Sequence, residues 1–560
     1  MKGDLCLRGG QVLDVFAGRF RAASVLIADG RVLGFGDRAR RTVDVEGCFL
    51  VPGLIDAHVH IESSQLSPAS FARAVIAHGT TTVIADPHEI ANVLGVDGVR
   101  YMLAATEGLA LRVLLMAPSC VPATPFETAG ARIGPEDVAL LLGWDRVLGL
   151  GEVMNYPGVL AGDPDVSAKL AAARGRPIDG HAPGLSAEAL SAYISAGPRT
   201  DHESSSLAEA EEKLAAGMCV LIREGSATRN FEALLPLLTE RSAPFVHFCT
   251  DDRHAETILR EGHIDGLVRR AIAAGVPPEI AITAATIHPA RSYGIDRVGA
   301  VAPGYAADLL VVSNLTAFEI REVYAAGKRV TAQESEPPSP ASQRTMNVRL
   351  PEAPFRIPAA SEGAARVIVV HPAGVVTDEE HVLPRVADGE IVADPARDLL
   401  KIAVVERHLG TGRVGLGLVR GFGLTSGALA STVAHDSHNV LVVGANDDAM
   451  ITAVRRLVEL GGGQVAVDAD HILAELALPI AGLMSPLSLD EVAEAQAALG
   501  TAARGLGCRL PSPFMTLSFL ALPVIPHLKL TDLGLVDVDR FELVPLYVDG
   551  GASASKSCTS

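Results

Sequence analysis

The sequence predicts an α/β protein made of a TIM-like (β/α)8 barrel, a small β-sandwich domain built from both flanks of the barrel, and an additional C-terminal α/β domain. Three observations support this prediction. Eight strand-like segments, most of them followed by an Ala-rich helical stretch, succeed one another over about 250 residues, which is typical of such a barrel. Polar residues end nearly every one of these segments, and short β-rich stretches flank the series on both sides.

The eight predicted barrel strands follow one another along the middle of the chain. They are the segments 54–60, 81–86, 112–119, 147–153, 177–183, 199–204, 218–225 and 244–252. Helices are predicted between them by stretches such as SPASFARAVIAHG and SAEALSAYISAG. Barrels of this kind hold their active sites at the C-terminal ends of the strands, so the polar residues there are the candidate functional residues.

The flanks of the barrel are rich in β-forming residues, with Gly at the joints. We expect residues 1–50 and 291–331 to form one small β-domain around a barrel at 51–290. The Pro- and Ser-rich residues 332–361 have the composition of a linker.

A second α/β region is expected after this linker, at residues 362–548. Within it, HNVLVVGAN predicts a buried strand, and DDAMITAVRRLVELGGG predicts a helix that stops at Gly. The tail 549–560 is expected to be disordered.

Composition excludes several classes of function. The 560 residues carry 47 Lys and Arg against 66 Asp and Glu, a formal net charge of −19, which argues against nucleic acid as a partner. No uncharged apolar run reaches about 18 residues and no signal peptide is recognisable, so we expect no membrane association and a cytoplasmic location. Seven scattered cysteines without a CxxC motif predict reduced thiols.

A histidine pair stands at the end of the first predicted strand. His58 and His60 are two residues apart, so alternation places both imidazoles on one face, the barrel interior. Adjacent buried imidazoles repel when protonated, and a shared metal ion is a natural use for them.

The other strand ends add further candidate ligands. They are Glu152 on the fourth strand, His181 on the fifth, His202 on the sixth, and Asp251 and Asp252 on the eighth. Nitrogen and oxygen ligands without thiolate suit Zn, Mn or Fe. Two metal ions about 3.5–4 Å apart could share Glu152 and one hydroxide.

Nine sequence motifs point to one family. They are PGLIDAHVHIESS (52–64), TTVIADPHEIANVLG (81–95), GEVMNYPGV (151–159), DGHAPGL (179–185), TDHE (200–203), REGSA (223–227), TDDRH (250–254), AHDSHN (434–439) and PFMTLSFLALPVIPHLKLTDLGLVD (513–537). With them the chain resembles, over nearly its whole length, the bacterial adenine deaminases of the metal-dependent amidohydrolase superfamily. Two of these motifs point to the adenine deaminases within the superfamily. One is ADPHE, and the other is GEVMN, where Glu152 stands in place of the carboxylated lysine of many superfamily members.

The resemblance implies a binuclear metal centre. His58 and His60 would hold one metal ion together with the eighth-strand aspartate, and His181 and His202 would hold the other, with Glu152 bridging. Two divalent ions are implied, with Mn or Fe favoured over Zn.

The eighth-strand ligand stays open between two neighbours. The superfamily usually has Thr/Ser-Asp there, which favours Asp251, and Asp252 is the alternative. Alternation predicts that only one of them faces the metals.

The resemblance also implies the reaction: hydroxide attacks C6 of adenine, giving hypoxanthine and ammonia. Asp251 would carry the proton to the leaving amine. Glu152 could act as a donor to N1 of the purine only if one of its oxygens is not bound to metal.

Other polar groups at the strand ends are weaker candidates. Asp86, His88 and Glu89 could bind a further metal ion or position the purine, and the alternative is a polar loop satisfied by backbone groups. The run Glu62 to Ser64 is expected to cap the next helix.

Two further motifs supply substrate-binding candidates. Arg223, Glu224 and Ser226 could contact the purine, with an internal Arg–Glu pair as the alternative. His435 and His438 are expected at the surface, although the family resemblance favours a functional role. We expect the C-terminal domain to cover the barrel mouth and a dimer to form.

Three other functions fit these residues less well than adenine deamination does. A cyclic amidohydrolase, such as a dihydroorotase or hydantoinase relative, would share the metal geometry, but GEVMN in place of a strand-four lysine counts against it. A scaffold protein on the same barrel would have lost metal ligands, and none is missing here. The zinc deaminases with a PCxxC signature are excluded because the chain has no CxxC.

Overall fold

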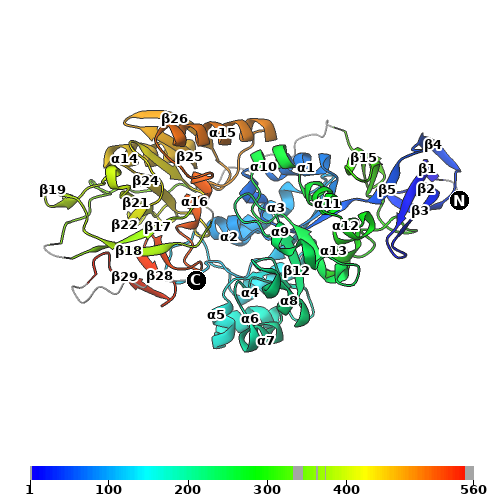
Figure 1. The fold of residues 1–560 in the computed structure, drawn as a ribbon, viewed down its shortest axis with the longest axis horizontal. Coiled ribbons are helices and arrows are strands. Elements are labelled where there is room, and N and C mark those ends of the chain that lie inside the picture. The colour runs from blue at the N-terminus through cyan, green and yellow to red at the C-terminus, as the bar shows by residue number, and fades with distance from the viewer. Residues whose placement is uncertain (1–2, 332–344, 361–362, 373, 549–560) are drawn as a thin grey trace. The chain divides into compact units, whose positions relative to one another are not determined.

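The computed structural model describes residues 3–331, 345–360, 363–372 and 374–548 (Figure 1). These residues form two compact units. The first consists of Met1–Val121, Arg132–Ala341 and Met484–Ala493, and the second of Pro122–Ala131, Ser342–Leu483 and Glu494–Ser560. In the described residues no helix combines the length and the apolar character that crossing a membrane needs.

The two flanks of the barrel meet in one sheet, as the sequence predicts. Its strands are β1 (Gly3–Asp14), β2 (Arg19–Ala28), β3 (Arg31–Phe35), β4 (Ala39–Asp44), β5 (Phe49–Pro52), β14 (Leu309–Asn314), β15 (Glu319–Ala325) and β16 (Lys328–Arg329). They pair in the order β16-β15-β14-β5-β1-β2-β3, with β4 beside β1. Strand β5 joins the two flanks because it pairs with β1 on one side and with β14 on the other.

Eight parallel strands form the barrel of the first unit. They are β6 (Leu54–Val59), β7 (Thr80–Ala85), β8 (Arg112–Ala117), β9 (Val147–Val153), β10 (Ile178–Gly180), β11 (Thr200–Asp201), β12 (Cys219–Arg223) and β13 (Val246–Cys249). Strands β6 to β10 form one sheet and β11 to β13 a second. The Arg199 amide donates to the Ile178 carbonyl at 3.0 Å and the Asp251 amide to the His58 carbonyl at 3.0 Å, which links the two sheets at both edges. The predicted barrel is therefore confirmed.

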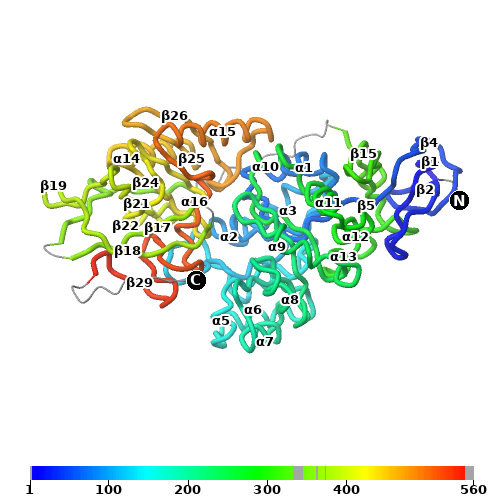
Figure 2. Tube along the Cα trace, viewed as in Figure 1, coloured from blue at the N-terminus to red at the C-terminus, as the bar shows by residue number. Residues whose placement is uncertain are grey.

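Helices follow the strands of the barrel along the chain, and Figure 2 labels several of them, among them α1, α8 and α11. They are α1 (Pro68–Ala77), α2 (His88–Leu94), α3 (Val96–Ala105), α4 (Pro135–Leu142), α5 (Tyr156–Ala161), α6 (Pro164–Ala172), α7 (Ala187–Ala196), α8 (Leu207–Ala215), α9 (Phe231–Leu234), α10 (Ala255–Glu261), α11 (Ile264–Ala273), α12 (Pro278–Ala284) and α13 (Ile287–Ser292). Ser67 caps α1 by accepting the Ser70 amide, with Pro68 at the first helical position. The prediction that Glu62 to Ser64 cap this helix is wrong, because they form a buried 3-10 turn of their own, Ile61–Ser64.

A buried lysine ties together the ends of β10 and β11. Lys213 Nζ donates to the Ala182 carbonyl at 2.6 Å, to Asp201 Oδ2 at 2.9 Å and to Glu209 Oε1 at 2.8 Å. We expect Lys213→Met to lower the stability of the protein by about 3–5 kcal/mol, because Asp201 would be left as an uncompensated buried charge. Urea unfolding followed by circular dichroism measures the loss, with exposed Lys328→Met as the control. Adding Asp201→Asn should restore part of the stability, and a single variant within about 0.5 kcal/mol of wild type would contradict the prediction.

The second unit is an α/β domain around a mixed sheet. Its strands are β17 (Ala365–Val369), β18 (Asp378–Val382), β21 (Leu400–Val405), β22 (Val414–Arg420), β23 (Ala428–Ser431), β24 (Val440–Gly444), β25 (Gly463–Asp468) and β26 (His471–Ala477). The segment HNVLVVGAN contains the fully buried β24, as predicted. The predicted helix is α14 (Asp447–Leu460), which begins after an Asn446 cap and ends at a left-handed Gly461.

Smaller elements complete the second unit. They are β19 (Val386–Ala387), β20 (Glu390–Ile391), β27 (Leu528–Thr531), β28 (Gly534–Asp537), β29 (Glu542–Val544) and α16 (Pro513–Phe519); α15 (Leu489–Gly505) begins in the first unit and ends in the second. Of the expected linker, residues 332–344 lie outside the described residues, as does the expected tail 549–560. Residues 345–360 belong to the second unit, where Met346, Phe355 and Ile357 are buried in its core.

Each unit includes one short segment whose neighbours in the sequence belong to the other unit. Thr128, from the loop after β8, donates to Asp532 Oδ2 at 2.7 Å within the second unit. Ser485 belongs to the first unit, where its amide donates to the Gln65 carbonyl at 2.8 Å and its carbonyl accepts the Ser67 amide at 2.8 Å.

We expect a chain cut after residue 331 to lose activity, because the fragment lacks the segment around Ser485 and leaves the segment around Thr128 without its partners. Expression of residues 1–331, assayed beside the full chain for soluble yield, circular dichroism and turnover, tests this. Full activity of the fragment would contradict it.

Candidate metal centre

The histidine pair of β6 lies buried at the C-terminal end of that strand. His58 is 1% and His60 3% exposed, and their Nε2 atoms are 3.2 Å apart. The other ring nitrogen of each histidine faces an oxygen: His60 Nδ1 lies 2.9 Å from the Asp86 carbonyl and His58 Nδ1 lies 3.6 Å from Asp179 Oδ2. Oxygen partners behind the rings are the arrangement that orients histidine ligands of metal ions, because they set which nitrogen stays free.

Glu152, at the end of β9, lies between two pairs of histidines. Its Oε1 is 3.2 Å from His60 Nε2 and 3.7 Å from His58 Nε2. Its Oε2 is 2.7 Å from His181 Nδ1 and 3.4 Å from His202 Nε2. Burial raises the pKa of Glu152, but the four histidines outweigh burial and hold this pKa well below its usual value. Each carboxylate oxygen thus faces a different histidine pair, as a bridging ligand would.

Both aspartates after β13 lie close to His60. Asp251 Oδ1 is 3.1 Å from His60 Nε2 and 3.5 Å from His58 Nε2, whereas Asp252 Oδ1 accepts a hydrogen bond from Ser63 Oγ at 2.5 Å. Donor atoms of His60, Asp251 and Asp252 all lie within 4.8 Å of one another. The expectation that only one aspartate faces this site does not hold, because Asp251 has a left-handed φ of 55° and alternation applies only to extended backbone.

The buried donors form overlapping triads that fit divalent metal ions. Groups with atoms within 4.8 Å of one another include His58–His60–Glu152, His58–His202–Asp251, Glu152–His181–His202, His60–Asp251–Asp252 and Asp86–His88–Glu152. All the donors are nitrogen or oxygen, and His202 Nδ1 and Asp179 Oδ2 are buried without a hydrogen-bond partner. Burial would lower the pKa of His58, but Asp179, Asp251 and Glu152 raise it well above its usual value. The carboxylates therefore favour positive charge at this centre, as protons or as metal ions.

The loop after β7 brings its polar side chains to the same centre. Asp86 Oδ2 accepts the Glu152 amide at 2.9 Å, and its Oδ1 is buried without a hydrogen-bond partner. His88 Nδ1 lies 3.5 Å from Asp86 Oδ1 and 3.6 Å from Glu152 Oε1, and His88 Nε2 lies 3.6 Å from Glu89 Oε1. Backbone groups therefore satisfy only part of the hydrogen-bonding capacity of these polar side chains. Asp86 and His88 can act as metal ligands beside Glu152.

Arg223, the last residue of β12, forms an internal ion pair. Arg223 Nη2 donates to Glu203 Oε2 at 3.2 Å, and Nη1 donates to Asp251 Oδ2 at 2.9 Å. Glu224 pairs instead with Arg270, Nη1 to Oε1 at 2.6 Å. Ser226 Oγ accepts the His254 amide at 2.9 Å. The Arg–Glu alternative therefore describes Arg223, with Glu203 rather than Glu224 as its partner.

Removing this arginine changes the acidity of Asp251. Burial raises the pKa of Asp251, and Arg223 is the largest influence that lowers it. We expect Arg223→Met to move the acid limb of the pH profile of kcat/KM to higher pH, by about one unit or more, because the carboxylate form is then less stable. Arg223→Lys should show a smaller shift, and Arg229→Met, in the loop after β12, is the control. A profile that overlays wild type would contradict this role.

Three carboxylates near the centre were not predicted: Asp56, Asp179 and Glu203. Asp56 Oδ2 accepts the Thr250 hydroxyl at 2.5 Å, which holds the end of β13 against β6. Asp56 and Asp179 each stand two residues before a predicted histidine ligand, so strand alternation was the signal for both. Glu203 directly follows His202 in the TDHE motif, and its Oε1 is 3.3 Å from His202 Nε2.

The histidines of AHDSHN lie in the second unit and are buried. His435 is 3% and His438 1% exposed, so the expectation of surface histidines is wrong. The His435 ring stacks on Phe519 with centroids 4.8 Å apart. Glu127 is buried in the same unit, where burial and then Asp436 raise the pKa of its carboxyl to about 8. In the same unit His435 Nδ1 lies 3.8 Å from Asp436 Oδ1, so acidic side chains accompany the buried histidine.

Family comparisons identify the class to which this barrel belongs. The amidohydrolase family matches residues 49–330. The chain belongs to the amidohydrolase family. The adenine deaminase C-terminal domain matches residues 374–542.

Similar proteins then specify the branch of the family. The chain is 50% identical over 560 residues to the adenine deaminase of Methanothrix thermoacetophila, covering 98% of both chains. It is 48% identical over 553 residues to that of Desulfatibacillum aliphaticivorans, covering 97% of both. It is 50% identical over 558 residues to that of Nitratidesulfovibrio vulgaris, covering 97% of this chain and 96% of that one. The resemblance drawn from the motifs is therefore confirmed.

Proposed function

We propose that this protein is an enzyme that hydrolyses adenine to hypoxanthine and ammonia. The observation that carries the proposal is Glu152, whose two oxygens face two separate histidine pairs at the mouth of an amidohydrolase barrel. The adenine deaminases to which the chain is similar align with it over nearly its full length, including the C-terminal domain. Both units thus support the same activity.

The histidine pairs and the carboxylates between them would hold two divalent metal ions. We propose His58, His60 and Asp251 as one set of ligands, His181 and His202 as the other, and Glu152 as the bridge. Metal ions held there would lower the pKa of a bound water toward 7 and so would supply the hydroxide at neutral pH.

The proton transfers of the reaction fall to Asp251. Its Oδ1 faces the histidine pair, and Arg223 holds its Oδ2 and keeps the carboxyl ionised. In the proposed reaction Asp251 accepts the proton of the attacking water and delivers it to the amine leaving C6. Both Glu152 oxygens face histidines, so we assign Glu152 to the bridge and not to N1 of the purine.

The remaining candidates have supporting roles in this proposal. Asp86 and His88 lie beside Glu152, where they would bind a further metal ion or help to fix the bridge. We propose no direct purine contact for Arg223 or Ser226, since both are engaged within the protein. For His435 and His438 a substrate role stays a prediction.

The ultraviolet absorbance of adenine tests the function directly. Full-length protein, reconstituted with Mn, should convert adenine to hypoxanthine. We propose Mn or Fe over Zn, and elemental analysis with parallel reconstitution compares the three. No conversion of adenine by protein with its metal bound would overturn the proposal, and turnover of a cyclic amide such as dihydroorotate would then favour that rival. Sedimentation analysis tests the proposed dimer.

A further inference from the structure

A cavity lies at the N-terminal ends of the barrel strands, whereas the metal centre lies at their C-terminal ends. Its volume is about 900 Å³ and it is lined from the starts of β9 and β10, from the residue before β11, and from α13. Leu148 and Ile178 lie near the N-terminal ends of their strands, whereas Glu152 lies near the C-terminal end of β9. Leu148 and Glu152 are four residues apart, about 13 Å along an extended strand.

The lining of this cavity has one sign of charge. Four arginines contribute to it, Arg174, Arg176, Arg199 and Arg291, and no Asp or Glu does. The whole chain has a net charge of −19, so such a concentration of positive charge goes against its composition.

These four guanidinium groups are not neutralised by neighbouring side chains. Within the described chain, none of the four forms an ion pair with a carboxylate. Arg176 donates to the carbonyls of Val147 and Leu142, at 3.2 and 3.0 Å. Arg291 lies over the Phe16 ring at 5.5 Å, a contact that leaves its charge in place.

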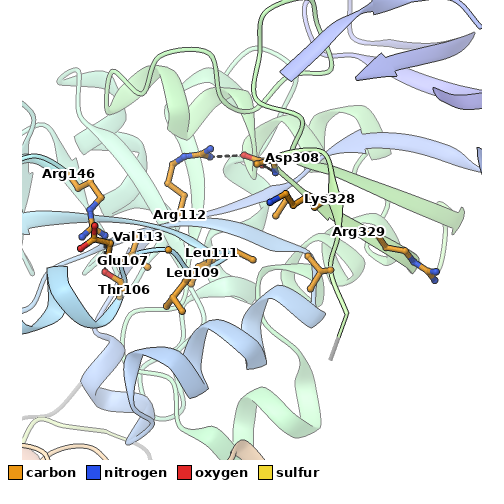
Figure 3. A pocket seen from close by; sticks show the side chains of 15 residues that line it. Thr106, Glu107, Leu109, Leu111, Arg112, Val113, Arg146, Asp308, Lys328 and Arg329 are labelled. Carbon is orange, nitrogen blue, oxygen red and sulfur yellow. Dashed lines mark hydrogen bonds and ion pairs between the residues drawn. The ribbon is translucent and has the colours of Figure 1, made fainter. Parts of the chain in front are cut away.

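Another cavity of the first unit shows the contrasting case (Figure 3). It measures about 530 Å³ and is also lined by arginines, but Asp308 and Glu107 line it as well. There Arg112 Nη1 pairs with Asp308 Oδ2 at 2.7 Å (Figure 3). Arginines at that cavity are thus accompanied by carboxylates, which the larger cavity lacks.

All four arginines are exposed to solvent, which screens their mutual repulsion, and two of them also lie near helix ends. Arg174 stands two residues after the last residue of α6, and Arg291 stands in the last turn of α13. The C-terminal end of a helix favours a cation, which offsets part of the mutual repulsion. This effect stabilises the arginines without occupying their hydrogen-bond donors.

We propose that this cavity binds a phosphorylated small molecule of about nucleotide size. Guanidinium groups bind phosphate oxygens with two parallel hydrogen bonds, and several together suit a multiply charged phosphate. The volume lies within the range of small-molecule sites, about 300–1,000 Å³. Leu148, Leu170 and Ile178 add apolar surface among the lining residues, which suits a ligand with an organic part beside its phosphate. The site is independent of the proposed deamination.

Uridine 5′-monophosphate is the probe, because its base lacks the adenine ring of the proposed substrate. Isothermal titration of the metal-loaded, full-length protein should show saturable binding of this nucleotide and none of uridine. In R174A/R199A the dissociation constant should rise about tenfold or more, since two of the phosphate-binding groups are gone. R38A/R241A removes the same charge from two other exposed arginines that do not line the cavity and should bind like wild type.

Several results would overturn the proposal. They are absence of saturable nucleotide binding, equal binding of uridine, an equal loss in R38A/R241A, or an unchanged dissociation constant in R174A/R199A. Sedimentation analysis adds another: if R174A/R199A dissociates an oligomer that wild type forms, the cavity is an interface between copies of the chain. Adenine turnover by R174A/R199A should equal that of wild type, which shows that the variant is folded and separates this proposal from the deamination.

Discussion

Glu152→Gln is expected to lower kcat/KM for adenine by at least about 10³-fold, or about 4 kcal/mol of transition-state stabilisation. The physical reason is the position of the carboxylate, with Oε1 3.2 Å from His60 Nε2 and Oε2 2.7 Å from His181 Nδ1. Glutamine keeps the shape but loses the negative charge, and its amide nitrogen cannot bind a metal ion. The bound metal should therefore fall from the proposed two ions per chain to one or fewer, as measured by elemental analysis.

A matched control separates this effect from a general one. Glu188 is exposed on α7, and Glu188→Gln should keep both the activity and the metal content of wild type. If Glu152→Gln retained its metal and stayed within about tenfold of wild-type activity, Glu152 would not be the bridging ligand.

Asp251→Asn is expected to lower kcat for adenine by about 10²–10⁴-fold, the usual worth of a general acid–base group. Asparagine retains an oxygen toward the histidines but cannot carry a proton between water and the leaving amine. The pKa of Asp251 is held low, chiefly by Arg223 acting against burial, so wild type keeps the active carboxylate down to low pH. An acid limb that belongs to Asp251 should disappear from the kcat profile of the variant.

Asp252→Asn tests the alternative at the neighbouring position. Asp252 lies within reach of His60 but accepts a hydrogen bond from Ser63 Oγ, so we expect a loss of about tenfold at most. If Asp252→Asn were the more damaging change, then Asp252 and not Asp251 would carry the proton.

Much of the candidate site could be predicted from the sequence because strand ends are local. His58 and His60 are two residues apart in a strand, and a period of two places them on one face in any barrel of this kind. The predicted strand ends also bring Glu152, His181 and His202 to one place, since parallel strands all present their C-terminal ends to the same face.

The errors arose where a side chain depends on partners distant in the sequence. Arg223 pairs with Glu203, twenty residues earlier, because β11 and β12 are neighbours in the sheet. His435 and His438 were expected at the surface, since a polar run such as AHDSHN gives no sign of burial, yet both are enclosed. Alternation also failed at Asp251, where the chain leaves the extended conformation after β13.

The fold class, the order of the eight barrel strands and the residues at their C-terminal ends could all be predicted from the amino-acid sequence alone. They follow from local hydrophobic patterns and from motif spacing, which can be recognised without knowing the tertiary contacts. Three features emerge only from the folded chain: each Glu152 oxygen faces a different histidine pair, Arg223 donates to Asp251, and four arginines line one cavity at the N-terminal ends of the barrel strands. Distances and charge pairing between segments far apart in the chain are properties of packing, and no local pattern records them.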